Sequence, residues 1–305
     1  MRFFSLVIVL LLGATRPAVG QISLEAVRIV TTDLDRDGQP EVITVGRVGG
    51  YRQGAGGRGG LQVSQPAGGR LRTLGYRDDT PILRDVAIGD FASDLTLDVF
   101  SIGEGWLWVH AYAHGDVTLV DAKRLDTDWT DRVAVLGDGV RTLVVATEYA
   151  IRPDSDVGMT RVRGFDCGPG SFEQIWTFDL SAHVGDLALL DADGPYLVLE
   201  TGTGDEGGDV LVYDVSGSPT RVWEGRTTSG RRCLVVEALA EGRVLLRSAD
   251  GDAVVFTLSG GVFRRERTLG AIEGDLVLHV LTNGHPGGVG TILPGKRWTI
   301  RPLAF

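Results

Sequence analysis

Short strand-like runs joined by glycine-rich or acidic turns recur along the chain, and this recurrence limits the possible folds more than any other feature. Six times an apolar run leads into a turn and then into a second apolar run, with the turns at Gly38, Leu95, Gly139, Gly194, Gly242 and Gly284. The intervals between these positions are 57, 44, 55, 48 and 42 residues. Long amphipathic helical patterns are absent, which indicates an all-β sandwich, barrel or propeller. A period of this length is typical of one four-stranded propeller blade per repeat.

We therefore predict an all-β chain folded as a β-propeller of four-stranded antiparallel blades, with six blades, or seven if one unit is not recognisable. A single domain is expected over residues 21–305, with approximate blades at 24–84, 85–128, 129–182, 183–228, 229–270 and 271–305. The last unit offers only three strand-like runs. A short strand near Ile22–Leu24 could complete it and close the ring with strands from both ends of the domain, which would leave no exposed sheet edge.

The stretch "TTDLDRDGQPEVITVG", residues 31–46, carries carboxylates at alternate positions, Asp33, Asp35 and Asp37, followed by Gly38 and Glu41. Three carboxylates packed in this way repel one another unless a counter-ion is present. Calcium resolves the repulsion because it takes six to eight oxygen ligands, and a glycine permits the sharp turn that brings them inward. The alternative is an ordinary Asp-Gly hairpin turn on a solvated surface.

The loop is not an EF-hand, because the twelfth position that needs a bidentate glutamate is Thr44 here. It is a shorter acidic loop between two strand-like runs. The predicted calcium ligands are the carboxylates of Asp33, Asp35, Asp37 and Glu41 and the backbone carbonyl of Gln39.

Glycine-rich strands follow the turns in two of the units, as "GRVGGYRQGAGGRGGLQVSQPAGG" in the first and "ETGTGDEGGDVLVYDVSG" in the fourth. Together with the D-x-D-x-D-G-x-x-E loop, this arrangement resembles the FG-GAP (VCBS-type) repeat, which builds the propeller head of integrin α subunits and many exported bacterial propellers. The resemblance extends over residues 24–305 as a pattern. It implies calcium binding on one face of the ring, with Asp33, Asp35, Asp37, Gln39 and Glu41 as ligands. The family more usually has Asp at the ninth loop position, so Glu41 is a departure.

The second unit keeps part of the same ligand pattern, with Asp90, Asp94 and Asp98 at the first, fifth and ninth positions. Ala92 replaces the third carboxylate and Leu95 replaces the glycine, which makes this loop a weaker calcium candidate. The other units keep no complete ligand set. Calcium is therefore expected to reinforce the fold locally, while closure of the ring depends on packing between blades.

The first twenty residues predict export. Arg2 precedes the apolar run Phe3–Leu12, and "AVG" before Gln21 fits a small-residue cleavage site, as in a secretory signal peptide. A secreted or periplasmic location follows, and no later segment reaches membrane-spanning length. Removal of residues 1–20 deletes Arg2 and Arg16 and no acid, so the formal charge changes from −10 to −12. This acidity argues against nucleic-acid or anionic-membrane partners.

The remaining motifs give no catalytic signature. No G-x-S-x-G motif occurs, His183, His279 and His285 are isolated in sequence, and Cys167 and Cys233 form either a disulfide or two buried thiols. Residues 148–164, "EYAIRPDSDVGMTRVRG", are predicted to form a long loop between strands. Its candidate contact residues are Asp154, Asp156, Arg161 and Arg163. The tryptophans expected in the blade cores are Trp106, Trp108, Trp129, Trp176, Trp223 and Trp298.

The sequence leaves two hypotheses for the function of this chain. The leading hypothesis is a calcium-reinforced binding or scaffold module, without enzymatic activity, that contacts a protein or glycan partner in the manner of an adhesion domain. The alternative is a propeller enzyme, such as a polysaccharide lyase or glycoside hydrolase, with its site at the central channel. The fold alone cannot separate them, because propellers support many functions.

Overall fold

The computed structural model describes residues 24–48, 58–68, 70–91, 96–137, 141–151, 158–168, 171–202, 208–226, 233–248, 251–272, 275–280, 286–292 and 301–302. All regular elements in these ranges are β-strands, which confirms the all-β prediction. No helix in these ranges has the length and apolar character that a membrane crossing requires. The predicted signal peptide, residues 1–20, lies outside them.

Twenty of the strands form five four-stranded antiparallel sheets, each made of strands consecutive in the chain. The first contains β1 (Leu24–Thr32), β2 (Glu41–Val48), β3 (Arg58–Ala67) and β4 (Arg70–Pro81). The second contains β5 (Asp85–Gly89), β6 (Asp98–Gly103), β7 (Trp106–Ala113) and β8 (Asp116–Arg124). The third contains β9 (Thr130–Gly137), β10 (Thr142–Ile151), β11 (Gly158–Gly168) and β12 (Ser171–Leu180).

The fourth sheet contains β13 (Asp186–Asp191), β14 (Pro195–Gly202), β15 (Gly208–Asp214) and β16 (Thr220–Gly225). The fifth contains β17 (Cys233–Leu239), β18 (Arg243–Ser248), β19 (Asp252–Ser259) and β20 (Val262–Ala271). A bridge between Gly208 and Cys233 joins the fourth sheet to the fifth.

The last strands are β21 (Asp275–Val280), β22 (Pro286–Ile292) and β23 (Arg301–Pro302), which pair antiparallel in that order. They join the first sheet through a parallel pairing of β21 with β1, in which Val30 lies opposite Leu278. Of the strand predicted near Ile22–Leu24, only Leu24 lies within the described residues, and the strand that it begins, β1, is the one that pairs with β21. Leu24 itself pairs with Val48 of β2.

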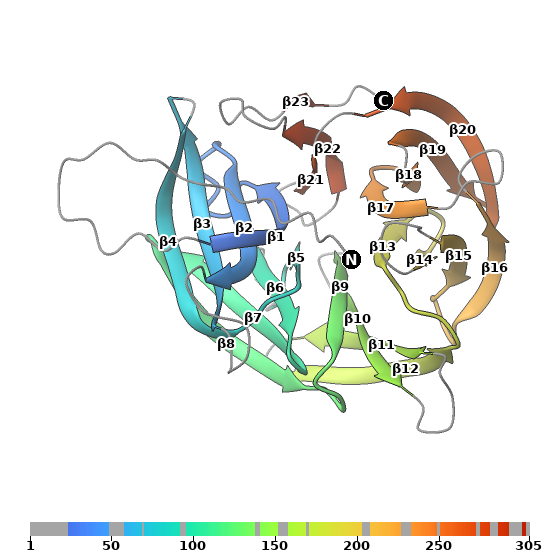
Figure 1. Ribbon diagram of the computed structural model, residues 1–305, viewed down its shortest axis with the longest axis horizontal. Coiled ribbons are helices and arrows are strands. Elements are labelled where there is room, and N and C mark those ends of the chain that lie inside the picture. The colour runs from blue at the N-terminus through green and yellow to red at the C-terminus, as the bar shows by residue number, and fades with distance from the viewer. Residues whose placement is uncertain are drawn as a thin grey trace.

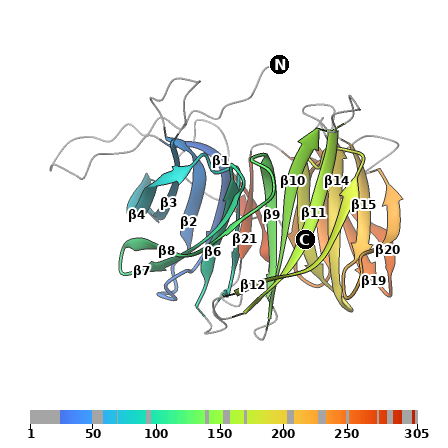
Figure 2. The same ribbon diagram turned by 90° about the horizontal axis from the view of Figure 1, so that it is seen from below.

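The sheets are arranged around a common centre in a propeller-like manner (Figure 1). The first strand of each sheet lies nearest the centre, and the fourth strand lies at the periphery. Neighbouring first strands contact one another in the order β21, β1, β5, β9, β13 and β17, and β17 contacts β22. Seen from the side, strands such as β9, β10, β11 and β14 stand across the thickness of the ring (Figure 2).

The hydrophobic core lies mainly between adjacent sheets rather than inside each one. Ile43 and Leu61 of the first sheet pack with Ile88 and Val99 of the second. Three further clusters join the second sheet to the third, the third to the fourth, and the fourth to the fifth. Each sheet therefore buries its apolar side chains against its neighbours, as repeat architectures require.

Tight turns connect the strands of several sheets. At Glu241-Gly242, between β17 and β18, both residues have positive φ, of 61° and 66°. This conformation matches the right-handed twist of the flanking strands, and glycine adopts it without steric cost. The acidic-Gly dipeptide seen in the sequence is therefore a hairpin turn here, as predicted.

Candidate metal centre and ligand pocket

The acidic loop connects β1 to β2 and gathers its aspartates. Oxygens of Asp33, Asp35 and Asp37 all lie within 4.8 Å of one another. Backbone amides hold them in place: the N–H of Gly38 donates to Asp33 Oδ2 at 3.0 Å, and the N–H of Gln39 donates to Asp37 Oδ1 at 2.8 Å. Gly38 has a φ of 86°, which favours glycine at this position.

Glu41 begins β2 and lies at the buried side of this loop. Its Oε2 accepts the N–H of Leu34 at 2.8 Å, while its Oε1 is buried without a hydrogen-bond partner. Asp33 Oδ1 is likewise buried without a partner. Burial is the main cause that raises the pKa of Glu41 to about 7. The hydrogen bond from Leu34 acts in the opposite direction, and the negative charges of Asp35, Asp37 and Asp33 add to the rise. Glu41 does not belong to the group of oxygens within 4.8 Å, so the three aspartates form the convergent part of the predicted ligand set.

These residues fit a calcium ion. All donors are oxygens, the carboxylates repel one another without a cation, and two buried oxygens have unused acceptor capacity. Among the residues that the structure describes, this is the one group of three or more carboxylate, histidine or cysteine side chains with such convergence.

The second acidic loop repeats one contact of the first. Asp98 Oδ2 accepts the N–H of Phe91 at 3.0 Å, as Glu41 accepts the N–H of Leu34, and each pair is separated by seven residues. Asp90 and Asp98 are both buried, and Asp94 lies outside the described residues. The ninth-position carboxylate therefore anchors the second strand to the loop in both units.

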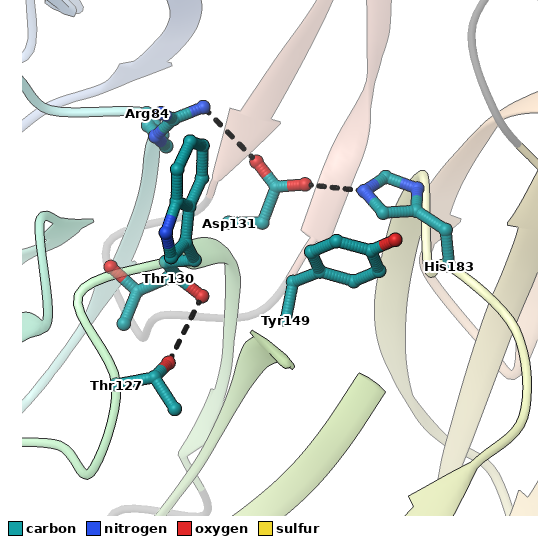
Figure 3. A pocket seen from close by; sticks show the side chains of 7 residues that line it. Arg84, Thr127, Thr130, Asp131, Tyr149 and His183 are labelled. Carbon is teal, nitrogen blue, oxygen red and sulfur yellow. Dashed lines mark hydrogen bonds and ion pairs between the residues drawn. The ribbon is translucent and has the colours of Figure 1, made fainter. Parts of the chain in front are cut away.

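A pocket of about 500 Å³ lies elsewhere, where the second, third and fourth sheets meet (Figure 3). It is lined by Arg84, Thr127, Trp129, Thr130, Asp131, Tyr149 and His183. Arg84 directly precedes β5, Asp131 lies in β9, Tyr149 in β10, and His183 precedes β13. The pocket thus uses residues near the starts of three successive first strands.

Asp131 and His183 form the polar centre of the pocket. His183 Nε2 lies 3.0 Å from Asp131 Oδ2, and its Nδ1 lies 2.9 Å from the carbonyl oxygen of Gly202. Both partners are acceptors, so the two bonds form together when the ring carries both protons, as an imidazolium. The hydrogen bond with Asp131 raises the pKa of His183 against the effect of burial. Burial by itself would raise the pKa of Asp131, but the bond from His183 and the charge of Arg132 lower it.

Arg84 and Trp129 form the outer wall of the pocket. The Arg84 guanidinium lies 5.7 Å from the centre of the Trp129 ring, and its Nη1 lies 3.9 Å from Asp131 Oδ1. The Nε of Arg84 is buried without a hydrogen-bond partner. Trp129 is 63% exposed, which contradicts its predicted place in a blade core. The reason is its position in the connection before β9, where it faces the pocket rather than a neighbouring sheet.

A buried ion pair fixes the segment that carries Trp129. Glu148 Oε1 accepts the N–H groups of Asp126 and Thr127, and its Oε2 accepts from Arg163 Nε at 2.7 Å. The predicted long loop at residues 148–164 is wrong in this respect, because Arg163 and Arg161 lie on β11, paired with β10. Arg163 is mostly buried and serves this ion pair rather than an exposed contact surface. Asp154 and Asp156 lie outside the described residues.

A charged cluster lies at the first strands. Arg28 of β1 pairs with Glu237 at 2.9 Å, Asp85 at 3.6 Å and Asp186 at 3.8 Å. Asp85 Oδ2 also accepts the N–H of Val133, and Asp186 Oδ2 accepts the N–H of Val236, each at 3.0 Å. These bonds tie β5 to β9 and β13 to β17.

Sequence reasoning missed the pocket because it treated His183 as isolated. Alignment of the repeats could have indicated it. Arg84, Asp131 and His183 all stand near the start of the first strand of their sheets, which are equivalent positions in successive repeats. Of the two cysteines, the side chain of Cys233 lies outside the described residues. Cys167 carries a free, buried thiol, and burial is the main cause that raises its pKa, which is typical of a structural cysteine.

Comparison with models of known protein families gives no match to this chain. A search of curated proteins also finds no match.

Proposed function

We propose that this chain is an exported, calcium-reinforced six-bladed β-propeller that acts as a binding module for a protein or glycan partner. In this proposal β21–β23 form the sixth blade, and the repeats are degenerate relatives of the FG-GAP (VCBS-type) repeat. The observation that carries the proposal is the acidic loop, where three carboxylates converge within 4.8 Å beside buried oxygens that lack a donor.

The proposed ligands are the carboxylates of Asp33, Asp35, Asp37 and Glu41 and the carbonyl of Gln39. Calcium would supply the positive charge that allows these groups to lie together. The protein contributes the turn at Gly38 and the amide bonds that orient the aspartates. Because the loop joins β1 to β2, binding there would stabilise the first sheet, whose β1 also pairs with β21.

The contacts of His183 and Arg28 are of the kind expected in a binding site. Both nitrogens of His183 are engaged with acceptors, and Arg28 is paired with three carboxylates at the first strands. These groups are arranged to hold charge in place, as in a recognition site on a rigid scaffold.

Thermal unfolding in EGTA and in millimolar Ca²⁺ tests the proposal. A ligand that binds only the native state adds about 2.7 kcal/mol at a hundredfold excess over its dissociation constant, so the midpoint should rise with calcium. Asp35→Ala should abolish the rise. The matched control is Asp116→Ala, which removes an exposed aspartate at the start of β8 and should leave the calcium response unchanged.

An unchanged midpoint in Ca²⁺ for the unaltered protein would contradict calcium reinforcement. A rise that persists in Asp35→Ala would place the ion at another site.

A further inference from the structure

We propose that the pocket formed by Arg84, Trp129, Asp131, Tyr149 and His183 binds a sugar ring that bears a carboxylate, as in the uronic acid residues of acidic glycans. This inference rests on the proposed role of the chain as a binding module and narrows its partner to one chemical class. Three features of the pocket support this inference independently: its charge, its unused hydrogen-bond donors and its exposed aromatic surface.

The charge of the pocket favours an anion. Asp131 faces three cationic groups: His183 at 3.0 Å, Arg132 at 3.6 Å and Arg84 at 3.9 Å. Arg132 is also engaged by the carbonyl of Gly185 at 2.6 Å and by Asp186 at 3.8 Å. The lining therefore holds one guanidinium, one imidazole whose two nitrogens face acceptors, and one carboxylate, in a chain whose formal charge is −10. A local positive site on an acidic surface selects anionic ligands.

Arg84 has donors to offer such a ligand. A guanidinium has five N–H donors, and Arg84 makes one long ion pair while its Nε is buried without a partner. Its side chain is 41% exposed, so a ligand can reach it. Arginine binds carboxylates with two parallel hydrogen bonds, which gives orientation as well as affinity.

The aromatic side chains indicate a ligand with an apolar face. Trp129 is exposed beside Arg84, and the Tyr149 ring packs edge-on against His183 with 5.2 Å between ring centres. In Figure 3, Asp131 lies between Arg84 and His183, with Tyr149 beside His183. A sugar ring combines a C–H face that packs on an indole with hydroxyls that donate to a carboxylate such as Asp131.

The size of the pocket agrees with this ligand, since about 500 Å³ lies within the range of small-molecule sites. The walls are also held in position before binding. The bonds of Glu148 to residues 126 and 127 fix the segment before Trp129, and the N–H of Tyr149 donates to the Trp129 carbonyl at 2.7 Å. A site built in this way needs little ordering when it binds.

Calorimetric titration of the purified protein tests the inference. The probes are trimers of galacturonic, glucuronic and mannuronic acid, each compared with its neutral hexose trimer and with a sulfated neutral trimer. We expect at least one uronate trimer to bind at least about tenfold more tightly than its neutral counterpart, as a hydrogen bond to a charged group allows. The affinity should fall as salt rises.

Two variants assign the binding to the pocket. Arg84→Gln and Trp129→Ala should each weaken uronate binding by about tenfold or more. The matched controls are Arg221→Gln, an exposed arginine on β16, and Tyr76→Ala, an exposed aromatic on β4. Neither control should change the affinity, and the unfolding midpoint of each variant establishes that it folds.

Absence of binding by all three uronate trimers overturns the inference, as does equal binding of the neutral trimers. Preference for the sulfated trimer, or unchanged affinity in folded Arg84→Gln, also overturns it. The calcium response of the same preparation distinguishes failure of this inference from failure of the proposed function. If Ca²⁺ stabilises the protein through Asp35 but no uronate trimer binds, the proposed function stands and only the ligand assignment is wrong.

Discussion

Glu200 is a carboxylate in an unusual position, buried in β14 within electrostatic range of His183. Its Oε1 has no hydrogen-bond partner. Burial, and next the negative charge of Asp186, raise its pKa to about 8, although His183 and Arg132 act in the opposite direction. At neutral pH the native protein therefore holds a proton on Glu200 that the unfolded chain releases.

This difference makes the stability of the protein depend on pH. Below its ordinary pKa, the carboxyl group of Glu200 is neutral in both the native and the unfolded state. As the pH rises above that value, the unfolded chain loses the proton while the native state keeps it, so the free energy of unfolding falls. Glu200→Gln keeps the neutral shape and removes the titration. We expect its stability relative to the unaltered protein to grow by about 1.4 kcal/mol per pH unit from about pH 4.5 to about pH 8, and then to level off.

Urea unfolding of both proteins across this pH range measures the difference. Glu173→Gln provides the matched control, because Glu173 is exposed on β12. Parallel pH profiles for Glu200→Gln and the unaltered protein would show that Glu200 is ionised in the native state.

The residues of the acidic loop and those of the pocket differ in how far the sequence can predict them. Asp33, Asp35 and Asp37 stand at alternate positions in one turn, so their convergence follows from local spacing. Asp131 and His183 are 52 residues apart and meet only because successive sheets lie side by side. Nothing in the residues around His183 indicates this partner, since the contact depends on the order of the sheets.

Among the elements, β11 and β12 show how one glycine determines the packing of a strand pair. Gly164 of β11 lies opposite Trp176 of β12, next to an irregularity in the pairing. A Cβ at Gly164 would stand 2.2 Å from Cε2 of the Trp176 ring. The indole therefore occupies the place where a side chain would be, and Trp176 is nearly fully buried there.

We expect Gly164→Ala to destabilise the protein by about 1–3 kcal/mol, because the methyl group forces the buried indole to move. Trp176→Leu removes the obstacle, so the double variant should lose less than the sum of the two single changes. Urea unfolding of the four proteins gives this coupling energy. Gly168→Ala is the control on the same strand, since a Cβ there meets nothing within 4 Å; strict additivity at positions 164 and 176 would exclude the steric explanation.

The hairpin of β10 and β11 also shows where strand prediction from sequence fails. Residues 148–164 read as a loop because charged residues interrupt the apolar pattern. In the structure, Glu148 and Arg163 compensate each other across the hairpin, so β10 and β11 continue through charged positions. Apolar alternation detects a strand whose polar side chains face solvent, but not one whose charges pair inside the protein.

At the scale of the whole molecule, the repeat period predicted the all-β class and the propeller-like arrangement, because each sheet is made of consecutive strands. The incomplete last unit led us to expect closure by strands from both ends of the domain, but it did not indicate which strands pair. The parallel pairing of β1 with β21 joins segments at opposite ends of the chain. It places β1, with Arg28, between the last strands and the second sheet.

Arg28 links several sheets at once. Its guanidinium pairs with carboxylates on β5, β13 and β17, which belong to the second, fourth and fifth sheets. Burial raises the pKa of Glu237 to about 7, and the charge of Arg28 opposes this rise. Without the cation, three buried carboxylates would face one another, and the pKa of Glu237 would rise further.

Arg28→Met should therefore destabilise the protein by about 3–5 kcal/mol, as breaking a buried ion pair does. The loss should be larger at pH 8 than at pH 5. The unaltered protein stops losing stability near pH 7, where Glu237 ionises beside Arg28, whereas the variant, in which the pKa of Glu237 is higher, continues to lose stability as the unfolded chain releases its protons. Adding Glu237→Gln removes one of the repelling charges and should restore part of the stability. Arg226→Gln breaks an exposed pair with Asp209 and should cost no more than about 1 kcal/mol. If Arg28→Met costs as little as this control at both pH values, or if Glu237→Gln adds to the loss, then packing between the sheets, rather than charge at their first strands, holds the ring together.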